Sequence, residues 1–326
     1  MQPLFRLVGL GVQFTEASGT TIHAVNGASL DVLPGEVLGV LGESGSGKTT
    51  LAKALLRLLP SNARATSETF ELAGRDLLKI GEKQLRALRG DQIAIIPQDP
   101  SQALNPVMRV GDQIAEVFRA HRDWSPKRCQ QEADLVLARV HLTDTTRRMY
   151  DAYPHQLSGG QRQRVVIAQA ICCQPAMVIA DEPTASLDSA SECEILELFR
   201  ELKRDYKMSL LFITHDPRLL IGLAERVAVV YGGRIVEIGP LTRVFGEPAH
   251  PYTKALLACL GPEGEYLTSG DRFPTIEGTS PDATSIPTGC SFAPRCSRRL
   301  EICNQHQPSA VELEDDRHVE CLLYGA

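Results

Sequence analysis

A glycine-rich loop between an apolar run and a helical pattern constrains this fold most. Residues 42–49 (GESGSGKT) fit the G-x-x-x-x-G-K-[ST] pattern at every position. The preceding run 37–41 predicts a buried strand, and residues 49–59 have helical periodicity that ends at Pro60. Backbone N–H groups of such a loop approach phosphate oxygens, Lys48 neutralises the β and γ phosphates, and Thr49 can ligate Mg²⁺. By itself, the loop fits kinases, GTPases and many other nucleotide enzymes. The predicted nucleotide contacts here are Gly42, Glu43, Ser44, Gly45, Ser46, Gly47, Lys48, Thr49 and Thr50.

An acidic pair follows a second apolar run. Asp181 and Glu182 come directly after residues 177–180 (MVIA), which predict a buried strand. A carboxylate at such a strand end, beside a phosphate loop, is suited to holding Mg²⁺ through water. Without the loop, the pair would be an ordinary acidic strand end exposed to solvent. We therefore predict that Asp181 binds Mg²⁺.

The pentapeptide Leu-Ser-Gly-Gly-Gln at residues 157–161 narrows the class of enzyme. It begins twenty residues before the apolar run that ends in the acidic pair. Together with the phosphate loop, it resembles the ATP-binding cassette (ABC) family, whose cofactors are ATP and Mg²⁺. The resemblance implies that Glu182 is the general base and that two subunits form the working enzyme. It also implies that the pentapeptide of one subunit contacts the nucleotide of the other, through Ser158, Gly159, Gly160 and Gln161.

Three further positions match this resemblance. Gln98, fifty residues after Lys48, resembles the Q-loop glutamine that reaches Mg²⁺ and the γ phosphate, although a lone glutamine usually marks a solvated loop. His215 follows the apolar run 210–213 and resembles the switch histidine at the γ phosphate, although a lone histidine is more often structural. Asp188 resembles the D-loop aspartate, and it equally fits a helix N-cap. The predicted catalytic residues are Glu182, His215 and Gln98, and the predicted Mg²⁺ ligands are Thr49, Gln98 and Asp181.

The patterns predict one α/β domain over residues 1–260, and the resemblance implies that it is a P-loop NTPase domain of the ABC nucleotide-binding type. Alternating apolar and polar residues over the first 35 positions predict an N-terminal antiparallel β subdomain. The resemblance implies an aromatic residue in that subdomain that stacks on adenine: Phe14 fits this role, with Phe5 as a competing candidate and packing of Phe14 within its strand as the alternative. Residues 102–165 favour a helical subdomain, and the strand runs 177–180 and 210–213 with a helix between them predict a mainly parallel sheet.

Residues 261–326 form a predicted irregular C-terminal extension that bears cysteines. Glycine and proline crowd residues 261–289, which predicts a linker or an irregular arm. The runs 250–253 (HPYT), 153–156 (YPHQ) and 289–296 (GCSFAPRC) resemble the oligopeptide and dipeptide importer branch of the ABC family. That resemblance implies a second ATPase subunit (identical or different), two transmembrane permeases and an extracytoplasmic solute-binding protein as partners. Nickel, glutathione or another small solute is an alternative cargo.

Four of the nine cysteines lie in the last 37 residues, at Cys290, Cys296, Cys303 and Cys321. Zinc sites commonly pair cysteines as C-x₂₋₄-C, and the spacing here is looser. Four thiolates can instead hold a [4Fe–4S] cluster, which the family resemblance also implies. The cluster is our main prediction, and zinc or reduced structural thiols are the alternatives.

Composition argues against several classes of protein. A formal net charge of −6 disfavours a duplex-DNA binder, so we expect no nucleic-acid partner. The sequence has neither a run of 18 apolar residues nor a secretion signal, which predicts a cytoplasmic protein with reduced thiols. The resemblance then predicts a peripheral position on the cytoplasmic face of the inner membrane, reached through protein partners.

Two rival functions fit part of the pattern. One is a soluble ABC ATPase that is not coupled to transport. ABC ATPases that act in translation carry two cassettes in one chain, and those that act in DNA repair carry long coiled coils or zinc modules. This sequence has one cassette and neither addition. The other is a nucleotide-gated regulator without hydrolysis, which disagrees with the presence of Lys48, Glu182 and His215.

Overall fold

The structure is a computed structural model that describes residues 2–142, 149–259, 275–285 and 287–325. These residues form two compact units. Unit 1 contains Val32–Val37 and Arg75–Ile213 with the first residues of the chain, and unit 2 contains Phe5–Asp31, Leu38–Gly74 and Thr214–Ala326. Within the described ranges, no helix combines the length and the apolar character needed to cross a membrane.

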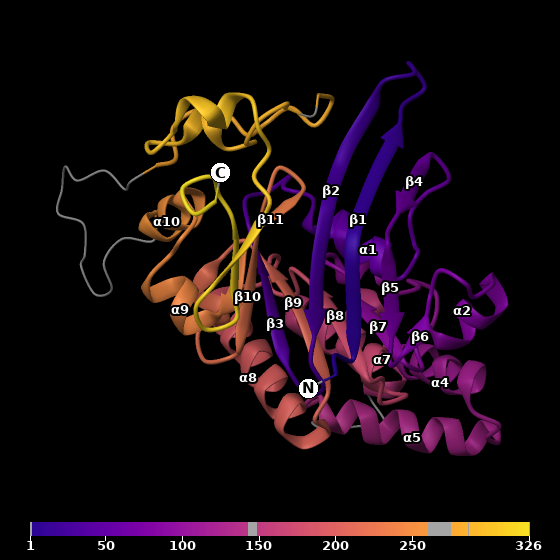
Figure 1. The fold of residues 1–326 in the computed structure, drawn as a ribbon. Coiled ribbons are helices and arrows are strands. Elements are labelled where there is room, and N and C mark those ends of the chain that lie inside the picture. Colours follow the sequence, from indigo (N-terminus) through magenta and orange to yellow (C-terminus); the bar gives the residue numbers. More distant parts are fainter. Residues whose placement is uncertain (1, 143–148, 260–274, 286, 326) are drawn as a thin grey trace. The chain divides into compact units, whose positions relative to one another are not determined.

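An antiparallel β subdomain begins unit 2, as the alternating N-terminal pattern predicts. Strand β1 pairs antiparallel with β4 and with β5, and β2 lies on its other side, so Figure 1 shows β1 and β2 as long neighbouring strands. The rings of Phe5 and Phe70 meet edge to face at 5.7 Å between β1 and β5. These strands are β1 (Phe5–Thr15), β2 (Thr21–Val32), β4 (Ala63–Thr66) and β5 (Thr69–Leu72).

A second group of strands in unit 2 carries the glycine-rich loop. The fully buried β3 runs parallel to β10, and three antiparallel pairs follow in the order β10, β11, β13, β12. The parallel pair agrees with the predicted sheet, whereas the antiparallel strands were not predicted from the sequence. The elements are β3 (Val37–Leu41), α1 (Lys48–Leu55), β10 (Arg226–Tyr231), β11 (Arg234–Pro240), β12 (Ala310–Leu313), β13 (Arg317–Glu320), α9 (Leu241–Gly246), α10 (Pro251–Ala258) and the 3₁₀ turn Pro217–Leu220.

Helix α1 is shorter than its periodicity predicts. It ends at Leu55, four residues before the expected end, because Arg57 adopts a left-handed backbone with φ 52°. The N–H of Leu58 then bonds to the carbonyl of Lys53, and the N–H of Arg57 bonds to the carbonyl of Ala54. This pair of bonds satisfies the last carbonyls of the helix, which is how a Schellman turn ends a helix.

Unit 1 contains three parallel strands and most of the described helices. Strands β7, β8 and β9 run parallel in that order. The predicted helical region is mainly helical where it is described, with short non-helical connections between its helices, and residues 143–148 lie outside the described part. Its elements are β6 (Arg75–Asp76), α2 (Glu82–Leu88), β7 (Ile93–Ile96), α3 (Pro100–Ala103), α4 (Val110–His121), α5 (Pro126–Arg139), the 3₁₀ turn Pro154–Gln156, α7 (Gly159–Ile171), β8 (Met177–Asp181), α8 (Ser189–Tyr206) and β9 (Ser209–Thr214).

Within unit 2, the C-terminal residues pack through aromatic rings. Phe292 meets Tyr231 at the end of β10 edge to face at 5.1 Å, and it meets Tyr252 of α10 at 5.4 Å. Between these residues and the hairpin β12–β13 lie two 3₁₀ turns, Ala293–Arg295 and Glu301–Asn304. The first part of the predicted linker, residues 261–274, lies outside the described residues.

Candidate nucleotide site

The glycines of the loop in unit 2 occupy positions that a side chain cannot enter. A Cβ at Gly42 would lie 2.3 Å from the carbonyl oxygen of Val230. Gly47 has φ 102°, and a Cβ there would lie 2.3 Å from the carbonyl oxygen of Ala24. Because both glycines are pressed against neighbouring backbone, the loop is fixed with its N–H groups at the start of α1.

Lys48 lies in the centre of this loop. Its Nζ donates to the carbonyl oxygens of Gly42 (2.8 Å) and Glu43 (2.9 Å), and the residue is 4% exposed. The hydroxyl of Ser46 is buried and has no hydrogen-bond partner among the described residues. A buried cation, an unpartnered hydroxyl and a helix N-terminus together fit a bound nucleotide phosphate.

Two predicted catalytic residues meet in unit 1. Strand β8 ends at the buried Asp181, and Glu182 follows with φ 46°, a backbone conformation that costs a non-glycine residue on the order of 1 to 3 kcal/mol. The N–H of Glu182 donates to the carbonyl of Ile213 at 2.9 Å, which fixes this turn. The side-chain amide of Gln98, just beyond β7, lies 3.4 Å from Oε2 of Glu182. Strain of this kind clusters at functional sites, where it holds a side chain in one direction.

The pentapeptide begins helix α7. Ser158 is the N-cap: its hydroxyl accepts the N–H of Gln161 at 3.2 Å, and its own N–H donates to the side chain of Gln161 at 3.0 Å. A Cβ at Gly160 would lie 3.2 Å from Oγ of Ser191 on α8. The start of α7 therefore lies against the start of α8.

Asp188 is the N-cap of α8. Its carboxylate accepts the N–H groups of Ala190 (3.1 Å) and Ser191 (3.0 Å) and the hydroxyl of Ser191 (2.8 Å). The backbone bond from Ser191 holds the pKa of Asp188 below its usual value. The N-cap interpretation of this residue is thus confirmed, and its D-loop role stays a prediction.

The remaining predicted residues lie in unit 2. His215 directly follows β9 and is exposed. Phe14 is half-buried in β1, opposite Ala63 of β4, so both packing and adenine stacking stay open for its ring. Each unit thus gathers its own part of the predicted set, with Lys48 and the loop in one and Gln98 and Glu182 in the other.

Sequence reasoning missed the contacts of Tyr252 and Arg295 with the loop. The N–H of Glu43 donates to the hydroxyl of Tyr252 at 3.0 Å. The carboxylate of Glu43 lies 3.0 Å from the guanidinium of Arg295. Both partners lie more than 200 positions from the loop, and no local pattern in the sequence signals either contact.

The four C-terminal cysteines gather in one region but do not form a metal-holding group. The N–H of Cys290 donates to the carbonyl of Cys303 at 2.8 Å. Burial raises the thiol pKa of Cys321, and charges on the Cys296 and Cys303 thiols raise it further, so these thiols lie near one another. However, the described residues contain no group of three or more histidine, cysteine or acidic side chains placed to hold a metal ion. The predicted [4Fe–4S] cluster is therefore not supported by this geometry.

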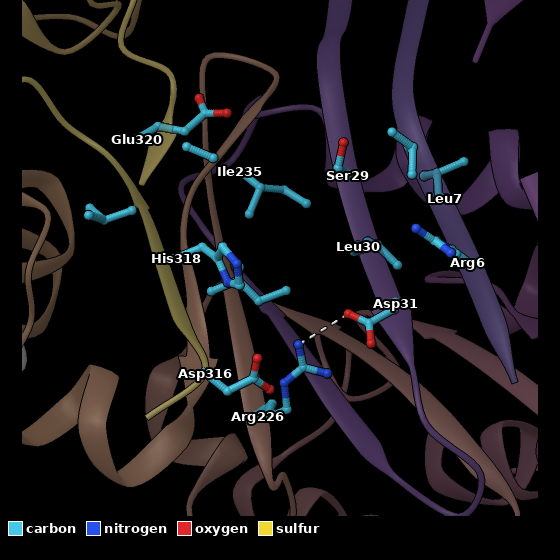
Figure 2. Close-up of a pocket in the computed structure, with 14 residues that line it drawn as sticks. Arg6, Leu7, Ser29, Leu30, Asp31, Arg226, Ile235, Asp316, His318 and Glu320 are labelled. Atoms are coloured by element: carbon cyan, nitrogen blue, oxygen red, sulfur yellow. Dashed lines mark hydrogen bonds and ion pairs between the residues drawn. The ribbon is translucent and has the colours of Figure 1, made fainter. Parts of the chain in front are cut away.

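A separate cavity of about 450 Å³ lies between the β subdomain and strands β10, β11 and β13 of unit 2 (Figure 2). Three of the charged residues at its wall form ion pairs: Arg226 with Asp31 at 3.2 Å, and Glu320 with Arg234 at 2.7 Å. The residues that line it include none of the predicted nucleotide contacts. We therefore assign no part of the nucleotide site to this cavity.

Comparison with known families assigns the segment that holds the phosphate loop, the pentapeptide and the acidic end of β8 to one family. Residues 25–185 match the family model described as ABC transporter, and residues 236–303 match that of the oligopeptide/dipeptide transporter C-terminal region. The dipeptide transport ATP-binding protein DppD of Bacillus subtilis (strain 168) is 40% identical over 324 residues, 99% of this chain and 95% of that protein. This chain belongs to the ABC transporter family.

Solved structures share the ABC ATPase fold of this chain. A dimeric ATP-binding cassette in a post-hydrolysis state with ADP and Pi superposes with a TM-score of 0.63 at 24% identity, over 73% of this chain and 98% of that chain. The cbiO1 protein of Clostridium perfringens, part of the ABC transporter complex cbiONQ, gives a TM-score of 0.60 at 27% identity, over 76% and 92% of the two chains. The β subdomain and the helical parts described above thus belong to the ABC P-loop fold.

Proposed function

We propose that this ABC ATPase supplies the energy for import of peptides through partner permeases. The proposal rests mainly on one observation: the same chain has a phosphate-binding loop whose glycines pack closely against neighbouring backbone, and a C-terminal region that matches that of oligopeptide and dipeptide transporters. Its similarity to a dipeptide transport ATP-binding protein extends over 99% of the chain. A soluble ABC ATPase without a transport partner would have no evident use for that C-terminal region.

The residues of the chain have distinct roles in the proposed reaction. Lys48 and the loop N–H groups bind the β and γ phosphates, since the ammonium already lies among the loop carbonyls. Thr49, Asp181 and Gln98 hold Mg²⁺, which supplies charge neutralisation at the transferred phosphoryl group. Glu182 orients and deprotonates the attacking water, and His215 contacts the γ phosphate. Phe14 stacks on the adenine in this scheme.

The pentapeptide completes the site of a second subunit. Ser158 begins α7 with the first N–H groups of the helix beside it, and such a helix start binds phosphate. The adjacent Asp188 and Gly160 lie at the same corner of unit 1. We propose that this corner faces the nucleotide of the partner ATPase subunit, so that ATP closes the dimer and hydrolysis reopens it.

Partners and cargo follow from the transporter assignment. We propose two permeases, an extracytoplasmic solute-binding protein and a peripheral position on the cytoplasmic face of the inner membrane. The test is reconstitution in liposomes with permeases that co-purify with this chain and with a solute-binding protein, followed by uptake of a labelled dipeptide. ATP-dependent uptake that disappears in Lys48→Ala supports the proposal. ATP hydrolysis that responds only to nickel or to glutathione would reassign the cargo, and hydrolysis indifferent to the permeases would favour a soluble ATPase.

We also propose that Cys290, Cys296, Cys303 and Cys321 are the ligands of a [4Fe–4S] cluster. Mutual proximity of the thiols supports this, as does their position directly after a linker with few apolar residues. When bound, the cluster would cross-link separate segments of the extension through thiolates. The thiols would have to move closer to bind it, because they do not stand at ligand distances in this structure.

A further inference from the structure

The second residue of the phosphate loop is held by the C-terminal extension. The carboxylate of Glu43 accepts from Nη1 of Arg295 at 3.0 Å and from the hydroxyl of Ser280 at 2.9 Å. Its backbone N–H donates to the hydroxyl of Tyr252, and burial raises the pKa of that hydroxyl, which keeps it protonated. All three partners lie in unit 2, together with the loop.

The side chain of Arg295 is buried and held by several hydrogen bonds. It is only 6% exposed. Nη2 donates to the carbonyl of Ile276 at 3.1 Å, and Nε donates to the carbonyl of Glu277 at 3.0 Å. The guanidinium also reaches the hydroxyl of Tyr231 at 3.3 Å and lies 5.8 Å from the centre of its ring. A planar guanidinium bound on several sides has little freedom to move away from Glu43.

The contact between Arg295 and Glu43 is linked to Lys48, the proposed phosphate-binding residue. The carbonyl oxygen of Glu43 accepts from Nζ of Lys48 at 2.9 Å, so the backbone that Arg295 holds through the Glu43 side chain is also a partner of Lys48. In addition, an unneutralised Glu43 carboxylate would repel the phosphates of ATP, because like charges within several ångströms interact strongly at a partly buried site. Arg295 supplies the opposite charge next to that carboxylate.

We propose that Arg295 is a positioning residue for ATP binding, and that through Glu43 it makes the ATP affinity of the loop depend on the C-terminal extension. Arg295 touches neither the nucleotide nor the attacking water in this scheme. It acts by neutralising Glu43 and by fixing the loop that holds Lys48. The proposal does not require a metal in the extension.

The test measures the affinity of the purified full-length chain for a fluorescent ATP analogue with Mg²⁺. Arg295→Met, which keeps the length of the side chain and removes its charge, should weaken binding on the order of tenfold, as expected for loss of a coupled, partly buried pair. Adding Glu43→Gln to this variant should restore the affinity to within about threefold of the original. Arg299→Met, an exposed arginine of the same segment, is the matched control and should bind like the original chain.

A purely structural role for Arg295 gives a different pattern. If the arginine only anchors the extension, Glu43→Gln will not rescue Arg295→Met, and that outcome would overturn the proposal, as would unchanged affinity in Arg295→Met. In the assembled transporter, the expected change is a higher KM for ATP with kcat preserved. If Arg295→Met fails to fold, Arg295→Lys decides: it keeps the charge beside Glu43, and a tenfold loss of affinity with native thermal melting would contradict the neutralising role.

Discussion

The side-chain amide of Gln98 lies 3.4 Å from Oε2 of Glu182, which joins the residues that follow two neighbouring parallel strands of unit 1. Glu182 reaches this position with a left-handed backbone, and its N–H is bound to the carbonyl of Ile213. The carboxylate is therefore directed by backbone geometry as well as by its amide partner. A substitution that preserves side-chain shape should keep this arrangement while removing basicity.

Glu182→Gln should retain MgATP binding and lose most steady-state hydrolysis. The amide keeps the shape of the side chain but cannot accept a proton from water, and loss of a general base commonly costs about 10² to 10⁴ in rate. In the proposed scheme Lys48, Thr49 and Asp181 still bind MgATP, so a closed dimer should accumulate with ATP. Phosphate release from the purified complex and size-exclusion chromatography with ATP provide the measurements.

The matched control for this experiment is Glu197→Gln. Glu197 is an exposed acid of α8 that pairs with the nearby Arg200 at 3.0 Å, a kind of surface pair that contributes little. Its hydrolysis rate should match that of the original chain. Undiminished turnover in Glu182→Gln would remove Glu182 from the role of base.

Gly160→Asp should abolish transport and spare nucleotide binding by the isolated subunit. A carboxylate at the start of α7 would repel the partner's phosphate, where the present glycine leaves the N–H groups accessible. The local cost is modest, because the new Cβ would lie 3.2 Å from Oγ of Ser191, a side chain that can shift by a few tenths of an ångström. ATPase activity of the assembled complex should fall by about 10²-fold.

Gly81→Asp serves as the control for Gly160→Asp. Gly81 is the N-cap of α2, a position that suits an aspartate. A Cβ added there would enter open space, with no described residue other than its chain neighbours within 4 Å. Loss of ATP binding by monomeric Gly160→Asp would show that the pentapeptide serves its own subunit, against the proposed action on the partner's nucleotide.

The extension should carry iron if its four cysteines are ligands. Protein purified without oxygen should be brown and contain about four irons per chain. Replacing Cys290, Cys296, Cys303 or Cys321 by Ser should lower the iron content. ATP binding should persist, because Glu43 of the loop contacts the extension through Arg295 and Ser280 rather than through these cysteines. Iron analysis, absorption spectra and nucleotide affinity check this.

Two other cysteines provide the comparison for the iron experiment. Cys193→Ser and Cys129→Ser should leave the iron content unchanged, since one thiol is exposed on α8 and the other is buried in α5. One zinc per colourless chain would identify a structural zinc site. A metal-free extension with unaltered protease resistance would leave the thiols as packing residues only.

Sequence patterns predict those elements of the fold that depend only on residues close together in the chain. The buried strand 37–41, the glycine loop and the acidic end of β8 depend on neighbouring residues, and the structure has them at those positions. The hairpin between β10 and β11 also had a local signal that went unused, because Gly232-Gly233 between two apolar runs is a typical two-residue turn with positive φ at both positions. The sequence could therefore have revealed this antiparallel pair.

Contacts between distant residues could not be predicted in this way. Glu43 and Arg295 are 252 positions apart, and neither has an unusual local context that would match one to the other. The end of α1 is a similar case, since a left-handed Arg57 is not signalled by residue type in the way that a glycine would be. For the cysteines, spacing suggested a ligand set, but spacing does not determine whether the thiols reach ligand distances.

Buried His250 should make the stability of the protein depend on pH. Its Nδ1 accepts the N–H of Tyr252 at the start of α10, which requires an unprotonated nitrogen, and burial lowers its pKa to about 4. The unfolded chain, with a pKa of about 6.5, therefore takes up the proton first as pH falls. Stability from this residue is complete above about pH 6.5 and is lost as pH falls towards 4, by about 2 kcal/mol at pH 5.

His250→Asn isolates this contribution, because asparagine keeps an N-cap acceptor and does not titrate. Urea unfolding of both proteins at pH 7.5 and pH 5 gives the measurement, and the original chain should lose about 2 kcal/mol more than the variant on acidification. The nearby Glu237 accepts the N–H groups of Ala249 and His250, and burial raises its pKa, so its protonation favours the folded state at low pH. Both proteins share that opposing effect, and it cancels in the difference. Equal losses of stability in the two proteins would show that His250 is already solvated enough to titrate normally in the folded state.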